Sequence, residues 1–162
     1  MSYDCVSIIG LGYIGLPTAA VFASREKKVI GVDVNQDAVD IINAGKVHII
    51  ELGLEAMVEE GIKNGFLRAV TSPEPADAFL IAVPTPFLKN ISEDSVPKPD
   101  ISYIESASKS VAKVLKKGDV VILESTSPVG TTEKMAEWLA QERHDLTFPQ
   151  THGSISDIRI AY

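Results

Sequence analysis

Two kinds of apolar segment alternate along the chain. Short runs rich in β-branched residues predict strands at residues 6–9, 29–32, 67–70, 79–83, 120–123 and, more weakly, 158–161. Between them lie longer stretches in which apolar residues recur every three or four positions, as on one face of a helix. This alternation is typical of βαβ units. It predicts an α/β protein with a doubly wound, mostly parallel sheet of about six strands and helices on both faces.

The expected helices carry start and stop signals. Asn35 is expected to cap a helix that ends at Gly45, and a second helix is expected to stop near Gly65. Residues 84–99 are rich in proline, and residues 144–156 are polar without clear periodicity. Both of these segments are expected to be irregular.

Two further helices follow in the second half of the chain. Asp100 is expected to cap a helix that runs to Leu115, and Thr131 or Thr132 opens the next one. Trp138 lies on the apolar side of that last helix, so it is expected to pack in the core rather than to contact a ligand.

Length, charge and cysteine content narrow the class of protein. The 162 residues suit one domain, and the net charge of −7 argues against a basic surface for nucleic acid or an anionic membrane. The longest apolar runs, such as 78–83, are far shorter than the roughly 20 residues that span a bilayer. A single cysteine cannot form an internal disulfide, which favours a reducing compartment and a cytoplasmic location.

The most informative segment follows the first expected strand. Gly10, Gly12 and Gly15 match the pattern G-x-G-x-x-G, in which the glycines make a tight turn, admit a pyrophosphate and let the helix pack on the strand. The N–H groups around Tyr13 and Ile14 lack intrahelical acceptors and are expected to donate to phosphate oxygens. The alternative is that the glycines only tighten a turn.

An acidic residue completes this pattern. Asp33 ends the second expected strand 18 residues beyond Gly15, where a dinucleotide-binding domain carries the acid that binds a ribose. A phosphate about 4 Å from this carboxylate would be repelled by about 4 kcal/mol at an effective dielectric constant near 20. The expected cofactor is therefore NAD rather than NADP.

Polar residues also follow the fourth and fifth expected strands. Thr85 and Thr126 lie in proline-flanked turns at the edge of the sheet where ligands bind, although each could also serve only the turn. Glu124 points toward the same edge as a candidate lining residue.

The remaining nucleophilic and metal-binding side chains fit no site. Cys5 starts the first strand, so it lies about 16 Å from the glycine turn and is expected to be a packing residue. His48, His144 and His152 have no metal-ligand spacing, and no metal site is predicted.

Four motifs in this order resemble the UDP-glucose/GDP-mannose dehydrogenase family over residues from about 5 to 162. They are GLGYIGLP at 10–17, GVDVN at 31–35, VPTP at 83–86 and ESTSPVG at 124–130. The resemblance implies that Tyr13, Ile14, Asp33, Thr85 and Thr126 contact NAD, and that Thr126 lies beside the reacting centre.

The same resemblance implies an activity and its missing parts. Members oxidise the C6 alcohol of a nucleotide sugar to a carboxylate with two NAD in succession, through a thiohemiacetal on a cysteine. Segments at 80–87, 115–118 and 134–140 most resemble the branch that acts on UDP-N-acetyl-D-mannosamine for surface polysaccharide synthesis. The family's nucleophilic cysteine, its central helix and its nucleotide-sugar domain are expected to lie outside residues 1–162. Residues 1–162 are therefore expected to bind NAD without turnover, and to be monomeric although full-length members are homodimers.

Three other functions are left open by the sequence. One is a stand-alone NAD-sensing regulatory module, and another is the NAD domain of a different UDP- or GDP-sugar dehydrogenase. The third is a two-domain hydroxyacid dehydrogenase, against which the proline-framed Thr85 and Thr126 motifs argue.

Overall fold

Six parallel strands form one sheet in the computed structural model, which describes residues 3–88 and 97–162. Their order across the sheet is β3-β2-β1-β4-β5-β6, and every neighbouring pair is parallel. The strands are β1 (Cys5–Ile9), β2 (Lys28–Val32), β3 (Leu67–Val70), β4 (Ala78–Ile81), β5 (Val120–Leu123) and β6 (Arg159–Ala161). The prediction of a doubly wound parallel sheet is confirmed. β4 ends at Ile81, two residues before its predicted end, although the N–H of Ala82 still donates to the Ile9 carbonyl of β1 at 2.8 Å.

The helices connect the strands as the sequence pattern predicts. They are α1 (Gly15–Ser24), α2 (Gln36–Asn43), α3 (Leu54–Lys63), α4 (Ser102–Ala112), α5 (Thr131–Glu142) and the short α6 (Pro149–His152), followed by the 3₁₀ turn η1 (Gly153–Ile155). Asn35 caps α2 through its side-chain oxygen, as predicted. Residues 149–155, expected to be irregular, are helical instead.

The predicted boundaries of α4 are wrong at both ends. Asp100 accepts the N–H of Ser102, but Ile101 occupies the cap position. The helix ends at Ala112, three residues before Leu115. The guanidinium of Arg143 donates to the carbonyls of Ala112 and Leu115 at 2.8 and 2.6 Å, so a residue distant in sequence satisfies the carbonyls where the helix stops.

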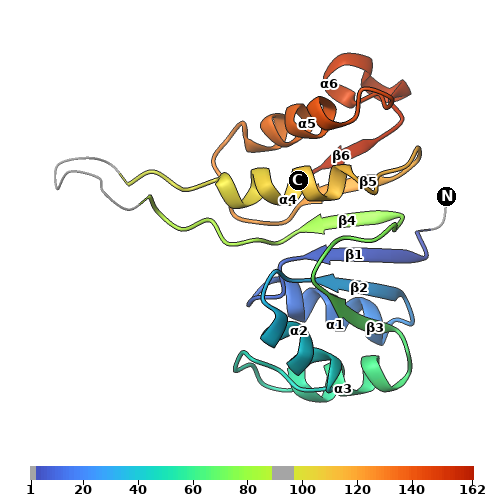
Figure 1. The fold of residues 1–162 in the computed structure, drawn as a ribbon, viewed down its shortest axis with the longest axis vertical. Coiled ribbons are helices and arrows are strands. Elements are labelled where there is room, and N and C mark those ends of the chain that lie inside the picture. Colours follow the sequence, from blue (N-terminus) through green and yellow to red (C-terminus); the bar gives the residue numbers. More distant parts are fainter. Residues whose placement is uncertain (1–2, 89–96) are drawn as a thin grey trace.

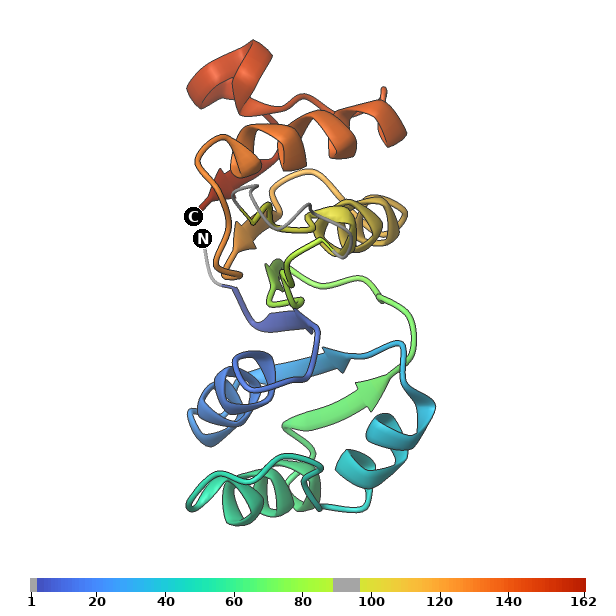
Figure 2. The same cartoon turned by 90° about the vertical axis from the view of Figure 1, so that its left-hand side faces the viewer.

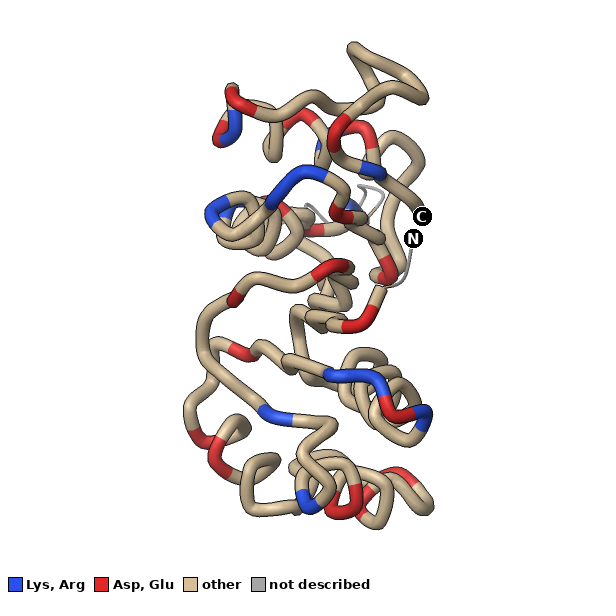
Figure 3. The backbone as a smooth tube through the Cα atoms, turned by 90° about the vertical axis from the view of Figure 1, so that its right-hand side faces the viewer, with Lys and Arg blue, Asp and Glu red and all other residues tan. Residues whose placement is uncertain are grey.

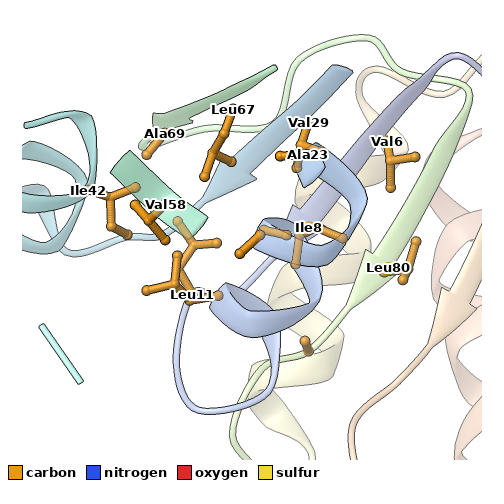
Figure 4. Close-up of a cluster of buried hydrophobic side chains, with 14 of the residues drawn as sticks. Val6, Ile8, Leu11, Ala23, Val29, Ile42, Val58, Leu67, Ala69 and Leu80 are labelled. Atoms are coloured by element: carbon orange, nitrogen blue, oxygen red, sulfur yellow. The ribbon is translucent and has the colours of Figure 1, made fainter. Parts of the chain in front are cut away.

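Two layers of helices bury the two faces of the sheet. In Figures 1 and 2, α1, α2 and α3 gather around the β1–β3 half, while α4 and α5 gather around the β4–β6 half. Alternate residues of β1 serve the two sides, since Ile8 packs in the α1–α3 core and Ile9 in the α4–α5 core. Figure 4 shows the first core, where Ile8, Leu11 and Val58 converge between strands and helices. Trp138 is partly buried against the second core, as predicted.

Charged side chains are spread around these layers. Acidic and basic positions are interspersed over the backbone drawn in Figure 3. Among residues 3–88 and 97–162, no helix is both long and apolar enough to cross a bilayer.

Hydrogen bonds of Lys116 link neighbouring strands at their amino-terminal ends. Lys116 Nζ donates to Asp119 at 2.6 Å, to the Ala76 carbonyl at 2.6 Å and to Asp77 at 3.2 Å. Asp77 also accepts the backbone N–H of Cys5 at 3.0 Å. This N–H holds the pKa of Asp77 below its ordinary value, and Lys116 adds to the effect, whereas burial raises the pKa of Asp119. The starts of β1, β4 and β5 are therefore joined by charged hydrogen bonds.

Replacing Asp77 by Asn should lower the free energy of unfolding at pH 7 by about 1 kcal/mol, a small value because the side chain is one-third exposed and screened. A carboxylate with a lowered folded-state pKa stabilises the protein above its ordinary pKa of about 3.9 and loses that effect as the pH falls. The difference between the two proteins should therefore shrink below about pH 4. Urea unfolding at a series of pH values measures it, with the exposed Glu137→Gln of α5 as control. A difference that stays constant down to pH 2.5 would contradict this assignment.

Candidate functional site

A cavity of about 660 Å³ opens at the carboxyl ends of the central strands. Its walls come from the turn between β1 and α1, from the ends of β2, β4 and β5, from the segment after β3, and from one side of α4. In a doubly wound sheet this is the edge at which ligands bind, where the strand order reverses on either side of β1. The volume falls within the usual range of roughly 300–1,000 Å³ for small-molecule sites.

The glycine turn forms the floor of this cavity. Gly10 has φ +95° and donates its N–H to the Val32 carbonyl at 2.8 Å, which fixes the end of β1 to β2. Gly15 begins α1 directly against the turn, and a Cβ atom there would overlap the Gly10 carbonyl oxygen. Gly12 differs from both, because a Cβ there would meet no atom within 4 Å. The space over Gly12 is open, as a close approach of a ligand to the backbone requires.

Unused backbone donors surround this opening. Within the described residues, the N–H groups of Gly12, Tyr13 and Ile14 have no hydrogen-bond acceptor. They immediately precede α1, whose first-turn N–H groups and dipole favour a negatively charged group. The turn therefore fits the diphosphate of a dinucleotide.

Asp33 ties the glycine turn to the end of β2. Its carboxylate oxygens accept the N–H of Leu11 at 3.0 Å and the N–H of Asn35 at 2.9 Å. Each oxygen keeps acceptor capacity, and the half-buried side chain lines the cavity. This arrangement fits a ribose diol. None of the described residues that line the cavity is Lys or Arg, so nothing there would neutralise the additional phosphate of NADP.

The two threonines meet across the ends of β4 and β5. Thr85 Oγ1 donates to the Thr126 carbonyl at 2.7 Å, and the two hydroxyl oxygens are 3.4 Å apart. Ser125 Oγ also donates to the Val83 carbonyl at 2.7 Å. The side chains thus cross-link the two turns, and both threonines line the cavity.

Seven of the eight residues predicted to hold the cofactor line the cavity: Gly10, Gly12, Tyr13, Ile14, Asp33, Thr85 and Thr126. Gly15 does not, since it acts from beneath the turn. Sequence reasoning missed a polar side of α4, where Tyr103, Ser106 and Ser110 reach the same cavity. Their spacing of three and four residues was the available signal, because it places them on one helix face.

Cys5 lies at the opposite edge of the sheet, where β1 begins, as predicted. Burial raises the pKa of its thiol, and the neighbouring Asp77 carboxylate raises it further. Both effects disfavour the reactive thiolate. Among the described residues, no three His, Cys, Asp or Glu side chains are grouped so that they could hold a metal ion.

Comparison with known proteins identifies similar chains. Residues 4–162 match the family model described as UDP-glucose/GDP-mannose dehydrogenase family, NAD binding domain. The chain is 63% identical over 162 residues to a UDP-N-acetyl-D-mannosamine dehydrogenase of Escherichia coli, and 62% identical over 160 residues to one of Campylobacter jejuni. The matches cover 100% and 99% of this chain but only 37% and 38% of those relatives.

A solved structure shows the same fold. The native UDP-N-acetyl-mannosamine dehydrogenase of Staphylococcus aureus superposes with a TM-score of 0.83 at 36% sequence identity. The superposition covers 96% of this chain and 35% of that one. The chain thus spans little more than a third of the proteins it matches.

The contrast between two glycines of the turn can be tested directly. Gly12→Ala should fold with unchanged thermal stability, because its methyl group enters open space, but should weaken NAD binding at least about tenfold. Gly15→Ala should instead lower the free energy of unfolding by about 3 kcal/mol, because its methyl group overlaps backbone. Thermal unfolding and titration calorimetry measure the two effects. Equal stability losses for both variants would contradict these roles.

Proposed function

This chain belongs to the UDP-glucose/GDP-mannose dehydrogenase family and spans its NAD-binding domain, and on that premise we propose that it serves an enzyme that oxidises UDP-N-acetyl-D-mannosamine at C6. Identity above 60% over the whole chain to dehydrogenases of that name supports the substrate. The observation that carries the role of this domain is one cavity lined both by the turn with unpaired N–H groups and by Asp33.

Each half of the cavity has a part in this proposal. The N–H groups of Gly12, Tyr13 and Ile14 hold the diphosphate, and Asp33 accepts the hydroxyls of the adenosine ribose. When bound, NAD accepts a hydride from the alcohol carbon of the sugar. Thr85 and Thr126 line the cavity beyond the turn, and their mutual hydrogen bond keeps that wall rigid.

The nucleophile and the sugar site belong to parts of the enzyme outside residues 1–162 in this proposal. Cys5 is the sole cysteine of the chain and begins β1 while the cavity lies at its end. A nucleophile must approach its carbon within about 3–3.5 Å, which Cys5 cannot do. The lone reduced thiol also supports the cytoplasm as the site of the reaction.

Asp33→Asn tests the choice of cofactor. The neutral amide keeps one acceptor oxygen but loses the charge that repels a ribose phosphate. Affinity for NAD should fall about tenfold, and the preference for NAD over NADP should fall by a larger factor. Calorimetry with both cofactors measures this, and Asp37→Asn, an exposed change on α2, is the matched control. An unchanged ratio of the two affinities, or no binding of millimolar NAD by the parent chain, would contradict the proposal.

Measurement of turnover tests the proposal that the nucleophile and the sugar site lie outside residues 1–162. Residues 1–162 mixed with NAD and UDP-N-acetyl-D-mannosamine should form no NADH, measured by absorbance at 340 nm. A longer protein that carries this domain should form two NADH per sugar and should prefer this substrate to UDP-glucose and GDP-mannose. Turnover by residues 1–162, or a preference for another sugar, would refute the corresponding part of the proposal.

A further inference from the structure

Glu124 is a residue of the cavity wall whose carboxylate is only partly hydrogen-bonded. Its backbone N–H donates to the Ile81 carbonyl at 2.9 Å, so the residue is anchored where β5 ends beside β4. Its Oε1 atom accepts the hydroxyl of Thr18 from α1 at 2.9 Å. Its Oε2 atom is buried and has no hydrogen-bond partner in the described part of the chain. Glu124 is also one of the residues that line the cavity.

Such an arrangement is unfavourable unless a hydrogen-bond donor or a positive charge compensates it. A buried acceptor without a donor or a cation loses its hydration and gains nothing in return. No Lys or Arg side chain lines the cavity within residues 3–88 and 97–162, so the described chain supplies no counterion there. Among the described residues, the Thr18 hydroxyl is the hydrogen-bond donor to this carboxylate, and the negative charge of the carboxylate acts on whatever binds in the cavity that Glu124 lines.

The order of the strands indicates which end of NAD lies near Glu124. Asp33 follows β2, and Glu124 follows β5, which is three strands away across β1 and β4. At about 4.8 Å per strand, the two acids lie on the order of 14 Å apart across the sheet. The glycine turn lies between them. With the adenosine ribose at Asp33 and the diphosphate at the turn, the nicotinamide half is the part that extends toward Glu124.

We propose that Glu124 makes this cavity prefer oxidised over reduced coenzyme, with Thr18 as the residue that positions it. The nicotinamide ring of NAD⁺ carries a positive charge, and the ring of NADH carries none. A carboxylate held in a partly buried wall attracts the cationic ring more strongly than it would in water. The inference rests on the proposed function. It adds that one side chain strengthens binding of NAD⁺ relative to NADH and so favours the exchange of NADH for NAD⁺, which an enzyme using two NAD in succession must make between its two steps.

Glu124→Gln isolates the charge, because the amide has nearly the same shape and still accepts the Thr18 hydrogen bond. Calorimetry on the 162-residue chain gives dissociation constants for NAD⁺, NADH and ADP-ribose, which lacks nicotinamide. Affinity for NAD⁺ should fall about tenfold, and affinities for NADH and ADP-ribose should each change by less than about twofold. Glu137→Gln on α5 removes an exposed negative charge that does not line the cavity and should alter none of the three.

Thr18 provides an independent test of positioning. Thr18→Val should reduce the ratio of NAD⁺ to NADH affinity in the same direction, and Thr18→Ser, which keeps the hydroxyl, should restore it. A structural defect alone would weaken all three ligands together.

Two results would overturn the inference. One is a Glu124→Gln variant that binds NAD⁺ and NADH with an unchanged ratio, and the other is an equal loss for ADP-ribose. Failure of the unaltered chain to bind either NAD⁺ or ADP-ribose would refute the proposed function itself, and the inference with it.

Discussion

The close contact between Gly10 and Gly15 is the constraint on which the site depends. Because residue 15 has no side chain, α1 begins directly against the carbonyl of the turn that ends β1. That placement leaves the N–H groups of residues 12–14 without intrahelical acceptors and at the cavity. It also brings the N–H of Leu11 to the carboxylate of Asp33. The contact that packs α1 against the turn therefore also leaves the N–H groups of residues 12–14 free to donate to a ligand.

Features encoded within one short stretch of chain were predictable from sequence. The strand, the glycine turn and the acid at the tip of the next strand follow one another within residues 5–33, so their spacing carries the geometry. The cap of α2 by Asn35 is equally local. The family resemblance is confirmed by the sequence model of that family, which matches residues 4–162.

Features that depend on distant contacts were not predictable. Where α4 ends, the carbonyls of Ala112 and Leu115 accept hydrogen bonds from Arg143, which directly follows α5. The sequence placed Thr85 and Thr126 at one edge, but only the register of β4 against β5 brings their hydroxyls to 3.4 Å. The polar side of α4 was not predicted as part of the site, because the apolar residues on the opposite side are enough to explain the helical pattern. Serines on a half-buried helix do not indicate a binding site by themselves, since only the fold shows which strand ends lie beside them.

The lack of cationic side chains at the cavity restricts how this turn could hold a phosphate. A lysine or arginine can reach a phosphate from several positions, since its long side chain adapts to small shifts. Backbone N–H groups cannot adapt in this way, because they donate well only within about 2.7–3.2 Å of an acceptor. No basic side chain lines the described cavity, and the acids Asp33 and Glu124 lie on either side of the turn. In the proposed function, the charge of a diphosphate would then be balanced by backbone donors and the dipole of α1. The open space over Gly12 would let the phosphate come close enough for those donors to act.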